Sequence, residues 1–462
     1  MKQHTLKKSF SISGIGLHTG EKVNMTFHPA PDNHGIKFKR IDLENQPEIR
    51  ADVGSVVSTN RGTSIGNSGA VVHTVEHALA ALSGMEIDNT LIEIDGIEVP
   101  ILDGSAGGFT DKLLKVGTVA QDADRVFIEI PTPIAYKDDE TGTELIVLPA
   151  EEFEITTMID FNSTTLGQQY AYLKNIKDFN RDISPARTFV FLREIEALIN
   201  QGLIKGGDLD NAIVIVDRLM NQQELDDLAK KLHKPSMKVD KKGYLNTTNL
   251  KFRNEPARHK LLDVIGDLAL VGKPIKGKVV TTKPGHTANV ELAKILKKLF
   301  LEQRKLKGIP KYDSNTPPIL NSQEIQKWLP HRYPFLLIDK IIEKTDTKVV
   351  GVKSITRNEE LFQGHFPGNP IFPGVLQIEA MAQTGGILAL STVPDPQNWN
   401  TYFLKIDNAR FKQTVVPGDT LILKMELTAP IRRGIVEMKG TAYVGNKIVS
   451  EGELTAQILR KD

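Results

Sequence analysis

Residues 254–267 have the types and the spacing of a metal-binding helix. If the stretch N-E-P-A-R-H-K-L-L-D-V-I-G-D is helical, His259, Asp263 and Asp267 recur every four residues and lie on one face. An imidazole and a carboxylate one turn apart can occupy two vertices of a tetrahedral zinc site, and a third ligand must come from elsewhere. The alternative is a solvated helix face with a charge pair four residues apart.

A second candidate for metal chemistry is the segment H-T-V-E-H at 73–77, within a helix expected over about 73–83. The pattern His73-x-x-Glu76-His77 matches the inverted zinc-protease motif, in which both histidines bind zinc and the glutamate is the base. Two other interpretations stay open. His77 alone binds a metal with Glu76 beside it, or polar residues simply flank the core of an Ala/Leu-rich helix.

Composition and charge narrow the class of protein. A chain of 462 residues should hold two to four domains, and its net charge of +1 gives no reason to expect binding to nucleic acid or an anionic membrane. It has no cysteine, which excludes disulfides and sulfur-ligated metals. No apolar leader or run of 18 apolar residues occurs, so we expect a cytoplasmic protein without a membrane span.

From its N-terminus the sequence is expected to alternate between strands and helices. Short strands are expected at 11–19 and 23–28, and a hairpin is expected from 90–94 and 97–101 across Asp95-Gly96. The Gly-rich stretch D-G-S-A-G-G-F at 103–109 lacks the Lys of a phosphate loop and predicts a tight turn before a helix.

A second α/β unit is expected from about residue 125. Its predicted elements are strands at 144–148, 153–159 and 212–216, a helix after A-R-T-F (186–189) that runs through 199, a polar insertion at 217–242 with a helix at 223–232, and a last helix ending near 307. His286 follows a Pro-Gly turn and should lie on a loop. A loop histidine usually has no chemistry, but beside a metal it is a candidate acid.

Together these motifs resemble the zinc-dependent UDP-3-O-acyl-N-acetylglucosamine deacetylases of lipid A synthesis, over residues 1–307. The resemblance rests on G-I-G-L-H-T-G (14–20), T-V-E-H (74–77), D-G-S-A (103–106), A-R-T-F (186–189), R-H-K-L-L-D-V-I-G-D-L (258–268) and G-H (285–286). It implies an α+β fold of two similar two-layer α/β subdomains, here 1–124 and 125–307, that face each other with the metal between them.

The resemblance also implies the metal ligands and the base. One zinc ion would be held by His77, His259 and Asp263, and His73 would be a bystander. Glu76 would take a proton from a water molecule whose pKa the zinc lowers.

Further roles follow from the same resemblance. Thr188 would stabilise the oxyanion, and His286, kept protonated by Asp267, would give its proton to the departing amine. Lys260 would add positive charge, and Phe189 would line the sugar site.

Two features depart from the family pattern. Gly62-Thr63-Ser64 stands in a loop where some relatives have cysteine. The insertion at 217–242 is longer than usual, and the equivalent region of the family lines the acyl-chain passage. The sequence therefore makes no prediction of acyl-chain length.

Residues 308–319 contain three prolines and no periodic apolar face, which predicts an extended linker before a separate domain at 320–462. That domain should have one long apolar helix over 374–390 and antiparallel strands, listed by residue: 348–355, 402–411, 420–427, 434–444 and 447–458. A helix wrapped by a sheet in so small a unit predicts dimerisation.

Glu379 lies inside the apolar run of this helix. A buried carboxylate needs a partner, so Glu379 is paired, exposed at an interface or kept protonated for proton transfer. His365 precedes it in a Pro/Gly-rich loop, and the Gly374 amide begins the helix, where backbone N–H groups attract a carbonyl oxygen. A base, an acid and an oxyanion donor are thus available together.

The motifs P-H-R-Y-P-F-L-L-I-D and G-H-F-P-G-N-P-I-F-P-G-V-L-Q-I-E-A-M-A-Q resemble the hot-dog-fold 3-hydroxyacyl-acyl carrier protein dehydratases. The resemblance implies His365 as base, Glu379 as acid and a site completed across a dimer. We therefore expect a bifunctional enzyme, a zinc amidohydrolase fused to a hydro-lyase with no further cofactor. Its partners would be a UDP-sugar lipid precursor and acyl carrier protein. The rivals are a zinc protease, and a thioesterase or acyl-binding module.

Overall fold

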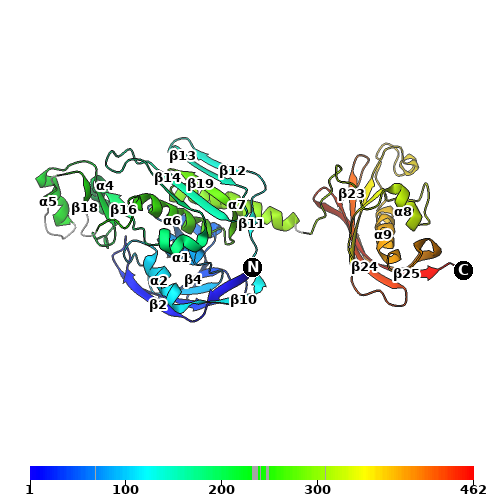
Figure 1. Cartoon of the computed structure of the whole chain (residues 1–462), viewed down its shortest axis with the longest axis horizontal. Coiled ribbons are helices and arrows are strands. Elements are labelled where there is room, and N and C mark those ends of the chain that lie inside the picture. Colours follow the sequence, from blue (N-terminus) through cyan, green and yellow to red (C-terminus); the bar gives the residue numbers. More distant parts are fainter. Residues whose placement is uncertain (68, 232–237, 240, 246–248, 307, 462) are drawn as a thin grey trace. The chain divides into compact units, whose positions relative to one another are not determined.

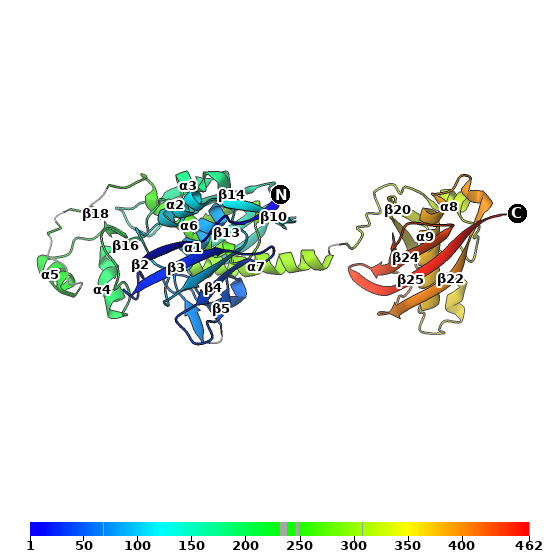
Figure 2. The ribbon, with the colours of Figure 1, turned by 90° about the horizontal axis from the view of Figure 1, so that it is seen from below.

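The computed structural model describes residues 1–67, 69–231, 238–239, 241–245, 249–306 and 308–461. Contacts between residues divide the chain into two units, Met1–Gln303 and Arg304–Asp462 (Figures 1 and 2). Within the predicted insertion, residues 232–237 and 240 lie outside the described ranges. Among the described helices, none is both long and apolar enough to cross a membrane.

The first unit uses one strand order twice. The first sheet has the order β2 (Phe10–Ile15), β3 (Lys22–Pro29), β9 (Thr90–Ile94), β4 (Ile36–Arg40) and β5 (Glu48–Arg50). The second has the order β12 (Ile134–Asp138), β13 (Thr143–Leu148), β19 (Ile275–Thr282), β14 (Phe153–Ile159) and β15 (Gln169–Leu173), with β11 (Ile128–Glu129) also paired to β19. In both sheets the last strand in the chain is central, antiparallel to one neighbour and parallel to the other.

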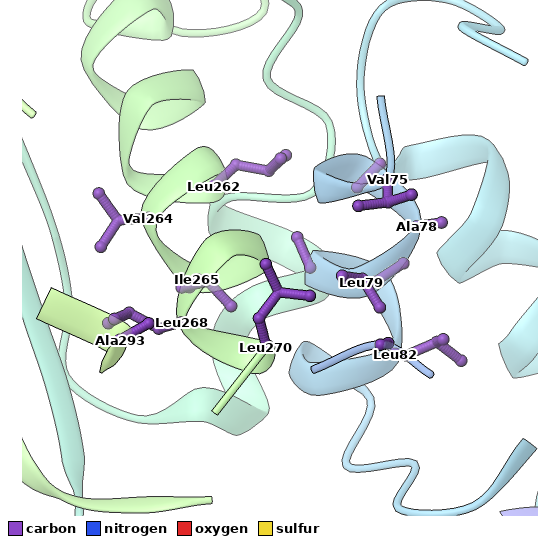
Figure 3. Close-up of a cluster of buried hydrophobic side chains, with 14 of the residues drawn as sticks. Val75, Ala78, Leu79, Leu82, Leu262, Val264, Ile265, Leu268, Leu270 and Ala293 are labelled. Atoms are coloured by element: carbon purple, nitrogen blue, oxygen red, sulfur yellow. The ribbon is translucent and has the colours of Figure 1, made fainter. Parts of the chain in front are cut away.

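Helices between the sheets bury the apolar faces. They are α1 (Glu76–Gly84), α2 (Gly107–Val116), α6 (Glu255–Ala269) and α7 (His286–Leu306). Leu79 and Leu82 of α1 lie near Leu262 and Ile265 of α6 in one buried cluster (Figure 3). Gly266 lets the two helices approach closely, because a Cβ at this position would lie 2.1 Å from the Glu76 carbonyl oxygen.

Shorter elements complete the first unit. A small sheet, β16 (Phe189–Phe191), β17 (Ile213–Val216) and β18 (Gly243–Leu245), packs with α4 (Leu192–Asn200) and α5 (Gln222–Lys231) around its own apolar cluster. The others are β1 (Lys2–Leu6) paired with β10 (Thr118–Asp124), the sheet β6 (Val56–Ser58), β7 (Ser64–Asn67) and β8 (Ala70–Val72), and the short helix α3 (Phe179–Asp182).

Two predictions of local structure around β9 and α1 were wrong. Residues 97–101 form no hairpin with β9; instead Glu98 turns inward, where its carboxylate accepts hydrogen bonds from the backbone amides of His18 and Thr19. The helix expected from 73 begins at Glu76, because His73 still belongs to a β-bridge. The helix expected after A-R-T-F is α4, which ends at Asn200, although the short strand β16 between them was not predicted.

The second unit is a hot-dog fold, in which a six-stranded antiparallel sheet wraps the long helix α9 (Gly374–Leu390). The strand order is β20 (Lys340–Lys344), β21 (Lys348–Ser354), β23 (Thr420–Leu427), β24 (Ile435–Val444), β25 (Lys447–Arg460) and β22 (Trp399–Phe411). The short helix α8 (Ser322–Trp328) and β20 were not predicted.

The stretch at 308–319 also differs from a free spacer. Ile309 and Tyr312 pack against a cluster on the sheet of the second unit, and the Lys340 ammonium donates to the Tyr312 hydroxyl at 3.0 Å.

Candidate functional site

Three side chains from both halves of the first unit form a buried potential metal site. His77 comes from α1, while His259 and Asp263 lie one turn apart on α6. Their ligand atoms all lie within 4.8 Å of one another, and each residue is at most 4% exposed. The solvated-helix alternative for 254–267 is therefore wrong.

The hydrogen bonds around this group leave metal-ligand atoms free. The His259 Nδ1 donates to the Ala186 carbonyl at 3.1 Å, so its Nε2 faces Asp263 Oδ1 at 3.4 Å. His77 Nε2 lies 3.8 Å from the same oxygen. Lys260 donates to Asp263 Oδ2 at 2.8 Å, but the buried Oδ1 has no hydrogen-bond partner among the described residues. An orphaned carboxylate oxygen between two imidazoles fits a divalent cation.

The electrostatics also suit a cation. Burial lowers the pKa of His77 to about 3 and lowers that of His259, so both rings are neutral at pH 7 and keep a lone pair for a metal. Burial opposes the charge of Asp263, but Lys260 and the neighbouring histidines His259, His286 and His77 together outweigh burial and hold the pKa of this carboxyl below its usual value. Two neutral imidazoles and one carboxylate are a donor set typical of zinc.

His73 lies outside this group. It precedes α1, and its Nδ1 is 2.8 Å from the Ser64 hydroxyl. The geometry of the inverted protease motif, with both histidines at one metal, is therefore absent among the described residues.

Glu76 is the first residue of α1 and is 3% exposed. Its Oε2 accepts a hydrogen bond from the Thr63 amide at 3.0 Å. Burial raises the pKa of the Glu76 carboxyl to about 7, which suits a group that takes up a proton near neutral pH.

His286 pairs with Asp267 on the other side of the group. Its Nδ1 donates to Asp267 Oδ2 at 2.9 Å, and its Nε2 lies 4.0 Å from Asp263 Oδ2. Burial opposes the charge of the ring, but Asp267, with smaller contributions from Glu76 and Asp263, outweighs burial and raises the pKa of His286 to about 9. The predicted loop position of His286 was wrong, because it is the first residue of α7.

Thr188 and Phe189 line a cavity of about 330 Å³ near the small sheet. Lys260 lies close to both the cavity and the metal-ligand group. Its ammonium donates to Asp263 and lies 5.9 Å from the centre of the Phe189 ring. His18 and Arg61 also line it and were not predicted. The signal for His18 was its place in G-L-H-T-G. The remaining lining is largely apolar, from α4, β17 and α5, and includes Leu192, Ile195, Leu198, Val214, Leu225 and Leu228.

In the second unit, Glu379 lines a cavity of about 290 Å³. Its Oε1 accepts a hydrogen bond from Gln383 at 2.9 Å and lies 3.7 Å from His331 Nε2. Its side chain is 18% exposed, so Glu379 is both paired and accessible from the cavity.

His365 and Gly374 lie on the same unit but not at that cavity. His365 Nδ1 donates to the Ile371 carbonyl at 2.7 Å, which leaves Nε2 as the ring's acceptor. Gly374 begins α9, where a Cβ would lie 2.7 Å from the Phe411 ring. Within the described part of one chain, no hydrogen bond or ion pair joins His365 to Glu379.

Comparisons with known proteins match both units. The profile of the UDP-3-O-acyl N-acetylglycosamine deacetylase family matches residues 3–230 and 228–298, and that of the FabA-like domain matches 329–453. The bifunctional enzyme LpxC/FabZ of Bacteroides thetaiotaomicron is 52% identical over 460 residues, covering 100% of this chain and 99% of its own. The bifunctional enzyme LpxC/FabZ of Porphyromonas gingivalis is 48% identical, and the match covers 99% of this chain and 99% of that enzyme. The UDP-3-O-acyl-N-acetylglucosamine deacetylase of Myxococcus xanthus is 40% identical over 63% of this chain and 85% of its own.

Proposed function

The chain belongs to the bifunctional LpxC/FabZ enzymes, and from that membership we propose how its own residues carry the two reactions. It is a deacetylase of lipid A synthesis and a dehydratase of fatty-acid synthesis. The substrate types are those of the two families, a UDP-linked acylated sugar and a hydroxyacyl thioester. This membership gives no support to the zinc-protease or thioesterase alternatives.

We infer one zinc ion per deacetylase unit, held by His77, His259 and Asp263. The observation that carries this proposal is the buried, unpartnered Asp263 Oδ1 between two imidazole nitrogens. When bound, zinc polarises a carbonyl and makes a nearby water molecule more acidic.

Glu76 is proposed as the general base. Its raised pKa keeps a large share of the carboxyl ionised at pH 7 while leaving it basic enough to take a proton from the attacking water. The Thr63 amide, bonded to Oε2, holds the carboxylate in one orientation.

His286 is proposed as the acid that protonates the departing amine. Asp267 keeps the ring charged up to about pH 9, so a proton is available at neutral pH. Thr188 lines the cavity and Lys260 lies beside the Phe189 ring that also lines it; both would stabilise charge on the substrate carbonyl oxygen. The Phe189 ring, which lines the cavity, would pack against the sugar.

For the dehydratase we propose His365 as the base at C2, Glu379 as the acid at the 3-hydroxyl and the Gly374 amide as the donor to the thioester oxygen. These roles favour a dimer, because no hydrogen bond or ion pair joins His365 to Glu379 within the described part of one chain. The edge strand β22 would bury its exposed apolar side chains there, namely Tyr402, Phe403, Leu404 and Ile406. We propose a homo-oligomer built through the second unit.

The test uses the full-length protein. Wild type should contain zinc and release acetate from UDP-3-O-acyl-N-acetylglucosamine, and Glu76→Gln should keep the zinc but lose about 10²- to 10⁴-fold in kcat. The dehydratase activity of the same preparation reports that the chain is folded. A zinc-loaded Glu76→Gln enzyme with full kcat would remove the proposed base.

A further inference from the structure

Thr63 contacts two carboxylates of the deacetylase site, that of the proposed base Glu76 and that of Asp267, the partner of the proposed acid His286. It is fully buried, with 0% exposure. Its amide donates to Glu76 Oε2 at 3.0 Å, and its hydroxyl donates to Asp267 Oδ1 at 2.5 Å. The same hydroxyl oxygen lies 3.4 Å from His286 Nδ1.

The direction of these hydrogen bonds follows from the chemistry of the partners. Asp267 is approached by three donors, the Thr63 hydroxyl at Oδ1 and the His286 ring and Asn289 amide at Oδ2. The Thr63 hydroxyl has one proton, which it donates to Asp267 Oδ1, because a carboxylate oxygen accepts hydrogen bonds. Without this hydroxyl, the buried Oδ1 loses its donor, and the carboxylate is free to turn.

The backbone of residue 63 is held in place independently of its side chain. The Thr63 carbonyl accepts a hydrogen bond from the Val75 amide at 3.1 Å, next to the bond from its own amide to Glu76. At Gly62, a Cβ would lie 3.0 Å from Glu76 Oε1, so the loop runs directly beside the carboxylate. The loop is therefore tied to the start of α1.

Only the hydroxyl of Thr63 then reaches across to α6, which belongs to the other half of the unit. The amide of Thr63 contacts Glu76 and its hydroxyl contacts Asp267. Thr63 therefore fixes the position of one carboxylate relative to the other. If residue 63 had no hydroxyl, only packing would fix the position of the Asp267 carboxylate relative to that of Glu76.

We propose that Thr63 is a positioning residue of the deacetylase, which acts through Asp267 to set the orientation of His286 relative to Glu76. This inference rests on the proposed roles of Glu76, Asp267 and His286. A misplacement of about 1 Å in a reacting group can cost about 10²-fold in rate, so a hydrogen bond that orients the acid affects kcat more than substrate binding.

The experiment compares Thr63→Val, which has the same shape without the hydroxyl, with Thr63→Ser, which keeps it. In the full-length protein, Thr63→Val should lower the deacetylation kcat by about 10- to 100-fold with KM changed less than about threefold. Thr63→Ser should retain kcat within about threefold. Zinc content, melting temperature and dehydratase activity are measured on every variant.

A matched control removes a buried hydroxyl elsewhere. Thr157 is also 0% exposed and is hydrogen-bonded to Thr281 at 2.9 Å in the second sheet. Thr157→Val should leave the deacetylation kcat unchanged. In an Asp267→Asn background, adding Thr63→Val should lower kcat by less than about threefold, because Thr63 acts on His286 only through the Asp267 carboxylate, which this background already lacks.

Several outcomes would overturn the proposal. Thr63→Val with wild-type kcat, or Thr63→Ser as impaired as Thr63→Val, would show that the hydroxyl does not act. Loss of zinc or folding in both Thr63→Val and Thr63→Ala would make the residue structural. If Asp267→Asn itself keeps full kcat, the proposed acid pair fails. An unimpaired Thr63→Val beside an impaired Asp267→Asn overturns only the role of Thr63.

Discussion

The buried Asp263 Oδ1 predicts which substitutions empty the metal site. His77→Ala, His259→Ala and Asp263→Ala should each lose most of the zinc, because each removes one of three protein ligands. His73→Ala should keep it, since His73 is bonded to Ser64 outside the group. Metal analysis of the purified full-length variants checks this. Zinc retained in Asp263→Ala but lost in His73→Ala would reverse the assignment.

The His286–Asp267 pair predicts a pH dependence. Asp267 raises the pKa of His286 to about 9, so the protonated acid persists at neutral pH and is lost as the pH rises through that value. The deacetylation kcat should therefore fall above about pH 9. In Asp267→Asn the partner that raises the pKa is gone, and the fall should begin at lower pH.

The measurement is kcat against pH for wild type, Asp267→Asn and His286→Gln. His286→Gln has no group to lose this proton, so its residual rate should be flat in the same range. A wild-type fall that persists unchanged in His286→Gln would assign it to another group.

At the residue scale, sequence patterns identified the side chains but not their surroundings. The spacing of His259 and Asp263 predicted a shared helix face, and the structure has both on α6. The sequence did not reveal that Lys260 pairs with one oxygen of Asp263 and leaves the other without a partner, because this depends on the rotamer of a neighbouring side chain. Nor did it connect Thr63 to Asp267, which lies far along the chain.

At the scale of elements, the crossing of α1 and α6 predicts a strong effect of Gly266. In Gly266→Ala the new methyl would lie 2.1 Å from the Glu76 carbonyl oxygen, so one helix must shift. We expect a loss of about 1–3 kcal/mol in unfolding free energy and a deacetylation kcat lowered at least tenfold. Urea unfolding and kinetics measure the two effects.

The control is Gly54→Ala, where the added Cβ meets only the Asp52 carboxylate at an ordinary 3.4 Å. Gly54→Ala should change neither stability nor kcat appreciably. Gly266→Ala with wild-type stability and rate would show that the helices are free to separate without consequence.

Local sequence patterns predicted the positions of helices and strands well, but not the segments against which they pack or with which they pair. The apolar helix α9 was expected at 374–390 and spans those residues. Asp95-Gly96 signals a hairpin, yet the chain after it is held by the buried Glu98 carboxylate against the 18–19 loop, a tertiary preference that turn chemistry cannot report. The missed helix α8 did carry a local signal, the capping box of Asn321 and Glu324.

At the scale of the whole molecule, His365 and Glu379 have different partners within one chain, and the proposed dimer site therefore predicts complementation. His365→Ala and Glu379→Gln should each abolish dehydration. After mixing by unfolding and refolding, random pairing should restore about a quarter of wild-type activity, because half of the dimers then have one intact site of two. Dehydration of a 3-hydroxyacyl thioester is the readout. Mixtures that stay inactive would place both residues in one subunit's site.

The same two variants test whether the units work independently. Each unit has its own hydrophobic core and its own site residues, so deacetylation should stay at the wild-type rate in His365→Ala and in Glu379→Gln. Acetate release by the same preparations measures this. A parallel loss of both activities would show that one unit depends on the integrity of the other.

The position of β19 in the second sheet has a consequence for synthesis on the ribosome. This strand separates β13 from β14, although both leave the ribosome long before it does. Until Ile275–Thr282 emerge, the nascent chain carries two unpaired strand edges, and the helix that begins with His286 has not been made. Chains that are cut short before residue 275 should therefore aggregate readily, and chaperones that cover strand edges should bind them.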